Sequence, residues 1–263
     1  LTPLPIQYTD YAAWQREVLA GDVLTAQQTY WQTQLADAPQ LLELPADYPR
    51  PAQQSYCGAH YQHALSAELT AQINQLSRTH NATQYMTLLA AFNVLLYRYT
   101  GQHDILVGSP IAGRTQRETE SLIGFFVNTL VLRTRINPTD PQTFTDLLHQ
   151  TRQTTLAAYA HQDLPFEQLV EALQPERSLS HSPLFQVLFV LQNNASTDLT
   201  LPGLDITPIT QDSPIAKFDL TLNAEETAGQ LKLTWEYVTD LFEPTRIERM
   251  AAHFTHLLTG LVE

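Results

Sequence analysis

One segment near the middle of the chain limits the possible folds more than any other. Apolar residues fall on every side of the helix predicted between Thr83 and Gly101; they are Met86, Leu88, Leu89, Phe92, Leu95, Leu96 and Tyr99. A helix that is apolar all round must be buried, so we expect it to pack against a sheet. Thr83 is a suitable N-cap, and Gly101 suits the position after the last turn.

Strand patterns follow this helix. Residues 104–112 and 184–191 are short apolar runs, typical of strands buried on both faces. Between residues 217 and 237, apolar and polar residues alternate on both sides of Glu225–Gly229, which predicts a hairpin with one buried and one wetter face. Further helices are predicted from Ser66, over Phe144–Tyr159, from Pro165 to near Leu173, and from near Glu243. This interleaving predicts an α/β fold, a mixed sheet with flanking helices.

The first fifty residues differ in character. Their prolines favour an extended start, and a short helix with one aromatic side follows. Thr25 is a plausible N-cap for a second helix that runs to near Leu35. The stretch Pro45–Pro51 predicts an extended connector laid over the surface.

Composition argues against several kinds of partner and location. A formal net charge of −13 disfavours nucleic acid, whose phosphates would be repelled, and anionic membranes. No apolar run approaches the roughly 20 residues that cross a bilayer, and the start lacks the features of a signal peptide. A first residue other than Met suggests a fragment of a longer protein, and we expect a cytoplasmic location. The single cysteine, Cys57, excludes an internal disulfide and is expected to be a small buried or half-buried side chain.

Metal-binding and nucleophile motifs do not occur in the sequence. His253 and His256 are three residues apart on a predicted helix, but they lack a third ligand. His60 and His63 should point to opposite faces of a strand. Gly-x-Ser-x-Gly is absent, and Gly113-Arg114 lacks the Lys-Ser/Thr of a nucleotide-binding loop. We therefore expect no metal site and no bound nucleotide.

The phrase His161–Glu167 has a catalytic and a structural interpretation. In the first, Asp163 orients His161 as a general base. In the second, Asp163 accepts backbone N–H groups at a helix start, while Pro165 and Phe166 fix the entry of the chain. The second gives every residue of the phrase a role, so we favour it.

A second phrase, Ile123–Arg133, predicts a loop that leads into a strand. Gly124 permits a turn that a Cβ would hinder. Asn128 has two open interpretations: it directs its amide into a substrate tunnel, or it satisfies buried backbone groups at a sheet edge.

Together with Tyr8–Trp14 and Arg177–Phe189, these phrases resemble, in order, the later signatures of condensation domains from nonribosomal peptide synthetases. In that family the catalytic signature His-His-x-x-x-Asp-Gly lies just upstream of a Tyr-x-Asp-Tyr-Ala-x-Trp phrase, whereas this chain has no two adjacent histidines. The resemblance implies the C-terminal lobe of a two-lobed, chloramphenicol-acetyltransferase-like fold. Residues 1–52 would be the connector and short helices leading out of the N-terminal lobe, and residues 53–263 the lobe itself.

The resemblance also implies a reaction. An acyl or peptidyl thioester on the phosphopantetheine arm of one carrier protein is attacked by the amine of an aminoacyl group on a second carrier. A histidine of the other lobe deprotonates the amine or stabilises the intermediate. This chain would supply channel wall, channel floor and carrier-docking surface, with no catalytic residue and no cofactor bound directly. The implied partners are the N-terminal lobe, peptidyl carrier proteins and a neighbouring adenylation domain.

Residues carried over from the family fall into two groups. The candidates for lining the channel or positioning substrate are Arg114, Gly124, Asn128, Gln192 and Asn193. The structural motif residues are Tyr8, Asp10, Trp14, His161, Asp163, Pro165, Phe166 and Glu167. The family also has an element that bridges the two lobes, and either the predicted hairpin or the stretch Asn193–Pro214 would serve.

Two other functions remain open at this stage. The lobe could be a docking platform for carrier or adenylation domains that does no chemistry. It could also belong to a related epimerisation or acyltransferase domain, although the phrases match the condensation group better. The sequence specifies neither donor nor acceptor, nor the configuration of the donor.

Overall fold

A computed structural model describes residues 4–139, 142–192, 204 and 214–263. The helices are α1 (Tyr8–Val18), α2 (Gly21–Gln34), α3 (Ala67–Thr79), α4 (Gln84–Thr100), α5 (Phe144–Ala160), α6 (Phe166–Leu173) and α7 (Pro244–Val262), with a short 3₁₀ helix at Arg117–Thr119. The strands are β1 (Gly58–Ala64), β2 (Asp104–Ile111), β3 (Asn128–Arg135), β4 (Val187–Gln192), β5 (Leu220–Thr227) and β6 (Gln230–Val238).

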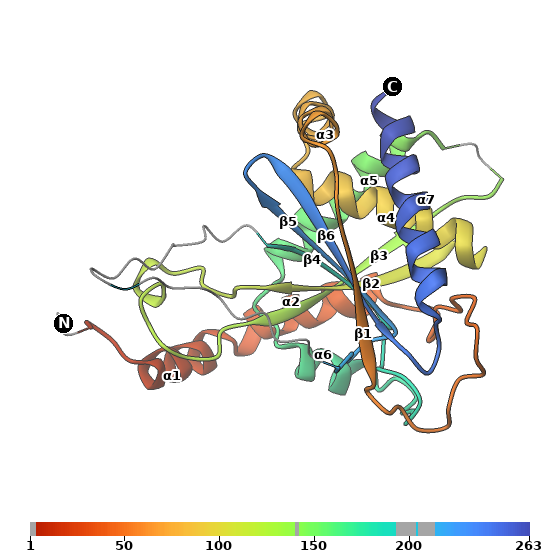
Figure 1. The fold of residues 1–263 in the computed structure, drawn as a ribbon. Helices are drawn as coiled ribbons and strands as arrows, with labels where there is room; N and C mark the ends of the chain where they lie inside the picture. The colour runs from red at the N-terminus through yellow and green to blue at the C-terminus, as the bar shows by residue number, and fades with distance from the viewer. Residues whose placement is uncertain (1–3, 140–141, 193–203, 205–213) are drawn as a thin grey trace.

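The strands form one mixed sheet in the order β1-β6-β5-β4-β2-β3 (Figure 1). Strand β4 pairs in parallel with β2 and β5, and the other neighbours are antiparallel. Helices cover both faces, because Thr134 on β3 bonds Asn93 of α4 while the adjacent Arg133 reaches the end of α2. The predicted α/β fold, a mixed sheet with flanking helices, is confirmed.

Helix α4 is buried on all sides, as its apolar pattern predicts. The ring of Phe92 lies 5.9 Å from that of Phe189 on β4, 6.0 Å from Trp235 on β6 and 6.2 Å from Phe254 on α7, measured between centroids. Thr83 caps the helix through its hydroxyl, and Gly101 ends it in the left-handed conformation. Strand, buried helix and terminal helix therefore share one core.

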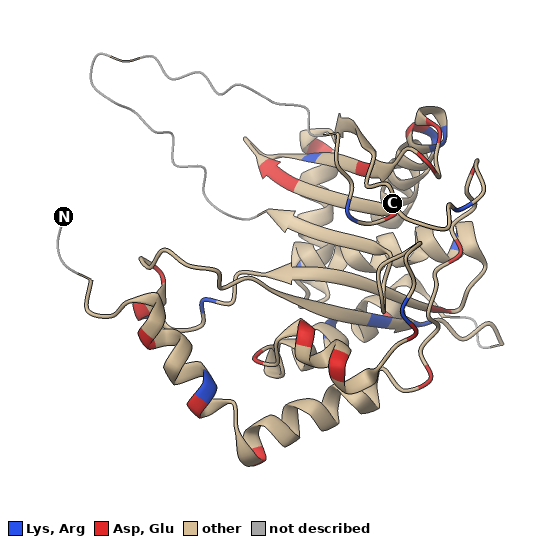
Figure 2. Ribbon diagram, turned by 90° about the horizontal axis from the view of Figure 1, so that it is seen from below, with Lys and Arg blue, Asp and Glu red and all other residues tan. Residues whose placement is uncertain are grey.

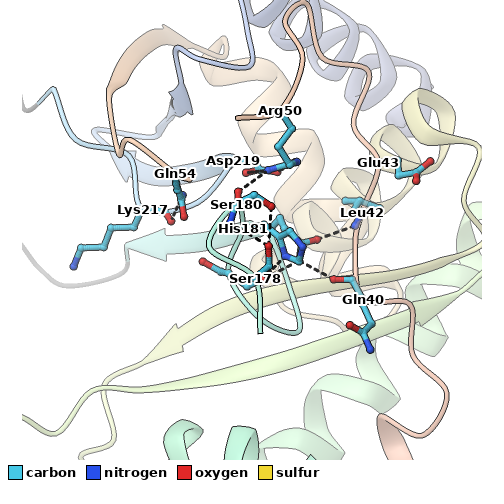
Figure 3. A network of polar contacts seen from close by, with 12 residues as sticks. Gln40, Leu42, Glu43, Arg50, Gln54, Ser178, Ser180, His181, Lys217 and Asp219 are labelled. Atoms are coloured by element: carbon cyan, nitrogen blue, oxygen red, sulfur yellow. Dashed lines mark hydrogen bonds and ion pairs between the residues drawn. The ribbon is translucent and has the colours of Figure 1, made fainter. Parts of the chain in front are cut away.

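The predicted hairpin is confirmed as β5 and β6, joined by Ala228 and Gly229. Along β6 exposed and buried residues alternate as expected. In β5 the first three residues are all buried, so its wetter face begins only at Asn223. The start of β5 is covered because Asp219 pairs there with Arg50 of the preceding connector (Figure 3).

Three predicted boundaries differ from the structure. Helix α2 begins at Gly21, where φ is +55°, and the hydroxyl of Thr25 donates within the helix to the Gly21 carbonyl instead of capping it. Strand β4 begins at Val187 because Leu184 has a φ of +67°, which interrupts an extended chain. Pro165 occupies the N-cap position of α6 rather than its first turn.

The first fifty residues also contribute to the core. Trp31 of α2 is 2% exposed, and Leu42 and Leu44 of the following connector belong to the same apolar cluster. The stretch Pro45–Pro51 lies over the surface as predicted, where Asp47 pairs with Arg246 of α7. Among the described helices, none is both long enough and apolar enough to cross a membrane.

Candidate functional site

Three of the four sequence phrases meet around one cavity of about 190 Å³, here called the motif cavity. Its lining comes from α1, from the loop between β2 and β3, and from the start of α6; the residues are Tyr8, Tyr11, Gln15, Gly113, Thr115, Phe125, Phe126, Val127, Asn128, Gln162, Asp163, Pro165 and Glu167. Asp and Glu residues occur on both α1 and α6 (Figure 2). Burial, together with the nearby Asp163 carboxylate, raises the pKa of the Tyr11 hydroxyl.

The loop between β2 and β3 is held against α1 by close packing. The Tyr8 hydroxyl donates to the Phe125 carbonyl at 3.0 Å, and the Tyr8 ring crosses that of Phe126 edge-on at 5.2 Å. A Cβ on Gly124 would overlap the Tyr8 ring. Glycine is therefore needed at position 124 for close approach, since a larger residue would push the loop away from α1.

Arg114 braces the same loop from within. Its guanidinium donates to the Thr119 carbonyl and lies 4.1 Å above the Phe126 ring. The preceding Gly113 has a φ of +63°, and a Cβ there would overlap the Phe126 carbonyl. Arg114 thus shapes the loop, and it is not among the residues that line the motif cavity.

Asn128 joins the sheet edge to helix α6. Its Nδ2 donates to the carbonyls of Gln162 and Leu164, both at 2.9 Å. Its Oδ1 accepts from the N–H groups of Phe166 at 3.0 Å and Thr129 at 2.9 Å. This uses the two donors of the amide and both acceptor positions of its oxygen. In the structure Asn128 satisfies backbone groups at the edge strand, one of the two roles left open by the sequence.

The start of α6 differs in one respect from expectation. We expected Asp163 to accept backbone N–H groups there, but Asn128 accepts the Phe166 N–H instead. An amide suits this position better than a carboxylate, because the same side chain must also donate to two carbonyl oxygens. The Asp163 carboxylate lines the motif cavity.

His161 is engaged in structural contacts. Its ring stacks on that of Tyr30 with centroids 3.9 Å apart and planes 6° apart. Its Nδ1 lies 2.8 Å from the Ala157 carbonyl, so this nitrogen carries the proton. Its own carbonyl accepts the indole N–H of Trp31 at 2.8 Å. These contacts anchor α2 and favour the structural interpretation of the phrase.

Two buried polar side chains were not anticipated. Arg133, at the end of the second phrase, is 4% exposed and forms a bidentate pair with Asp104. It also donates to the carbonyls of Gln34, the last residue of α2, and of Ala36, two residues further on. The sequence carries only a weak signal for this role, an arginine that follows the apolar run Leu130–Leu132.

The other is Gln186 in the fourth phrase. It accepts from the Leu42 N–H at 2.8 Å and donates to the carbonyls of Gln40 and Ser182. Figure 3 shows this network beside Arg50, which binds both Asp219 and the Ser180 carbonyl. The fourth phrase therefore fastens residues 40–50, which lie between α2 and β1, to the sheet.

The remaining candidates are more scattered. Gln192 is exposed at the end of β4, and Asn193 lies outside the described residues. Cys57 is exposed, so the expectation of a buried side chain was wrong; its backbone pairs with Ile215 in an isolated bridge just before β1, which leaves the thiol outside the core. Within the described residues, no three His, Cys, Asp or Glu side chains are arranged to hold a metal ion.

Comparison with known proteins agrees with this architecture. A family model described as the condensation domain matches residues 1–263. The chain is 55% identical over 263 residues to one of the subunits of linear gramicidin synthase from Brevibacillus parabrevis, and 50% identical over 261 residues to malpinin synthetase of Mortierella alpina. Each match covers 99% of the chain and 3% of the relative, so the chain spans a small part of these proteins.

Solved structures show the same fold. The X-domain from teicoplanin biosynthesis matches 100% of this chain and 61% of its own, with a TM-score of 0.88 and 26% identity. A four-domain nonribosomal peptide synthetase bound to AMP and glycine matches 92% of this chain and 20% of its own, with a TM-score of 0.82 and 28% identity.

Proposed function

Because the chain belongs to the condensation-domain family, we propose that it forms the C-terminal half of a site that makes peptide bonds between carrier-bound substrates. Residues 1–52 lead out of a preceding lobe, and residues 53–263 form the lobe that walls and floors the channel. The donor is an acyl or peptidyl thioester, and the acceptor is an aminoacyl group. Both arrive on phosphopantetheine arms of carrier proteins in the cytoplasm, beside an adenylation domain.

The chemistry divides between the two lobes. The acceptor amine attacks the thioester carbonyl, the C–S bond breaks, and the amine proton passes to a base of the preceding lobe. This chain contributes positioning, which can lower a barrier without any proton-transfer group. In support, the only close histidine–carboxylate contact among the described residues, 3.2 Å between His60 Nε2 and Glu236 Oε2, lies at an exposed position on the edge strand β1.

One observation carries the proposal. The loop between β2 and β3, held from behind by Tyr8, Arg114 and Gly124, presents three large apolar side chains to solvent. Their exposed fractions are 95% for Ile123, 75% for Phe125 and 50% for Val127. Exposed apolar side chains that cluster on a well-held loop are expected where the surface of another domain or protein packs against them. We propose that the preceding lobe packs against these three side chains.

The candidate channel residues take distinct roles in this account. Arg114, Gly124 and Asn128 set the shape of the loop and of the start of α6, and so position the channel floor indirectly. Gln192, exposed at the end of β4, is the described candidate with a side chain free to meet substrate. Asn193 lies outside the described residues and stays a candidate through the family resemblance alone.

Reconstitution tests the proposal. The chain is mixed with the preceding lobe and two loaded carrier proteins, and the product on the acceptor carrier is identified by mass spectrometry. We expect amide product in the mixture and none with the chain alone. Product from the chain alone, or none from a folded complex of both lobes, would contradict the proposal.

A docking platform without chemistry is the second candidate. The full use of the Asn128 amide by backbone groups favours it, since that side chain is not free to bind substrate. Carrier binding without turnover in the same mixture would establish this role. An epimerised donor, or acyl transfer to a soluble acceptor, would instead identify one of the related domain types.

A further inference from the structure

A second cavity shares no lining residue with the motif cavity, although both reach the start of α6. We call it the phenylalanine cavity, after Phe166, Phe185 and Phe218 in its walls. It lies between the residues before β1, the start of α6 and the residues before β5, and its volume is about 760 Å³. Sites for small molecules usually have volumes of about 300–1,000 Å³ and mostly apolar walls.

The aromatic wall is built into the fold. The Phe185 ring lies 5.6 Å from that of Phe166 and 5.2 Å from that of Phe218, measured between centroids. Phe185 itself is 2% exposed, and its ring occupies space where a Cβ on Gly108 of β2 would overlap it. The wall is therefore fixed by core packing and does not need a ligand to form.

A single charge stands at this apolar cavity. Lys217 is the only charged residue among those that line it in the described part of the chain. Its carbonyl accepts from the Gln54 side chain at 3.0 Å, which fixes the backbone, while the side chain is exposed (Figure 3). The nearest acid in sequence, Asp219, is bound by Arg50. No described carboxylate lies within 4 Å of the Lys217 ammonium.

We propose that the phenylalanine cavity binds a small amphiphilic carboxylate, such as a medium-chain fatty acid. The alkyl chain packs against the three phenylalanine rings, and the carboxylate lies beside the Lys217 ammonium. Because the chain has a net charge of −13, it repels anions in general. A ligand that combines an alkyl chain with a carboxylate is favoured instead, since it matches both the apolar wall and the Lys217 ammonium.

The only cysteine offers a direct measurement. Cys57 lines the cavity and is exposed, so a bound ligand should shield it. The rate of Cys57 alkylation by N-ethylmaleimide is measured while decanoate is titrated below its micelle concentration, and decanol serves as the neutral match. We expect saturable protection by decanoate and weaker protection by decanol.

The two lysines of the chain provide matched variants. Lys217→Gln should weaken protection by decanoate about two- to fivefold, as expected for one exposed ion pair, and leave decanol unchanged. Lys232 is exposed on β6, and Lys232→Gln should change neither the protection by decanoate nor the protection by decanol. A double variant, Cys57→Ser with Ala71→Cys on the exposed side of α3, should show no protection at all.

Several outcomes would overturn the proposal. Absence of protection by decanoate would show that the cavity does not bind such a ligand. Equal protection by decanoate and decanol would show that the cavity binds apolar chains without using the carboxylate. An equal effect of the two lysine variants would show a general effect of charge. Protection of the thiol at position 71 would show that decanoate acts on the whole fold. None of these results bears on peptide-bond formation.

Discussion

Asn128 shows how a family signature can serve the fold of a site rather than its chemistry. Its amide holds two carbonyls and one N–H at the turn before α6, and one further N–H on its own strand. These partners include positions 34 to 38 residues away in sequence. The amide therefore fixes the distance between the edge of the sheet and the acidic start of α6.

Replacing Asn128 should destabilise the fold. Asn128→Ala leaves two carbonyls and one N–H at α6 without their partner, and we expect a loss of about 2–4 kcal/mol in the free energy of unfolding. Urea denaturation followed by circular dichroism measures it. Gln162→Ala is the control, because only the backbone carbonyl of Gln162 bonds Asn128, and it should change stability by less than about 0.5 kcal/mol. Equal effects of the two variants would contradict the role of Asn128.

His63 should make the fold sensitive to acid. Its ring lies between β1 and α7, where Nε2 is 3.2 Å from the Thr255 hydroxyl, and burial lowers its pKa below the ordinary value of 6.5. The unfolded chain then binds a proton more readily than the folded chain, so stability is lost as the pH falls below about 6.5. His63→Gln should flatten the dependence of the unfolding free energy on pH between 6.5 and 5. His256→Gln, at an exposed position on α7, should leave the dependence unchanged; an unchanged slope in both variants would exclude His63 as its source.

At the scale of elements, sequence reasoning succeeds where the determinants are local. The caps at Ser66 and Thr83 and the buried helix α4 depend on residues within a few turns of one another, and each was predicted. The bond from Asn128 to α6 and the bond from Arg133 to the end of α2 join segments far apart in sequence. Their polar partners are backbone groups, which carry no residue-specific signal, so no pattern in the sequence predicts them.

The β5–β6 hairpin carries a correctable local strain. Ala228 and Gly229 form a two-residue loop with φ of +52° and +77°, the signs of a type I′ turn. Asparagine tolerates a positive φ better than alanine. Ala228→Asn should therefore raise the free energy of unfolding by about 0.5–1 kcal/mol, measured by thermal or urea denaturation. Gly229→Ala should lower it, and a loss of stability in Ala228→Asn would contradict this account of the turn.

At the scale of the molecule, three of the four phrases that resemble one family meet around the motif cavity and leave an apolar loop exposed. Residue identity alone did not separate the loop's buried residues from its exposed ones: Leu122 is 4% exposed, while neighbouring Ile123 is 95% exposed. That distinction depends on how α1 packs behind the loop, through Tyr8 and Gly124.

Substitutions in this loop should separate stability from association. Phe125→Ser should leave the melting temperature of the chain within about 2 °C, because the side chain is 75% exposed, and should weaken binding to the preceding lobe at least tenfold. Leu122→Ser should lower the melting temperature markedly, since it places a hydroxyl in a buried site. Calorimetry and a binding titration measure the two effects. Unchanged binding by Phe125→Ser would remove this loop from the proposed contact between lobes.

The proposed function divides the work: this chain positions substrates, while the base lies in the preceding lobe. The most direct test is the single-turnover rate of amide formation by the two lobes joined, with loaded carriers at saturation. We predict that His161→Gln retains the rate within a few-fold, whereas alanine at the second histidine of the His-His-x-x-x-Asp-Gly motif lowers it by about 10²–10⁴. A loss of that size in a folded His161→Gln variant would contradict the account and place a catalytic group in this chain.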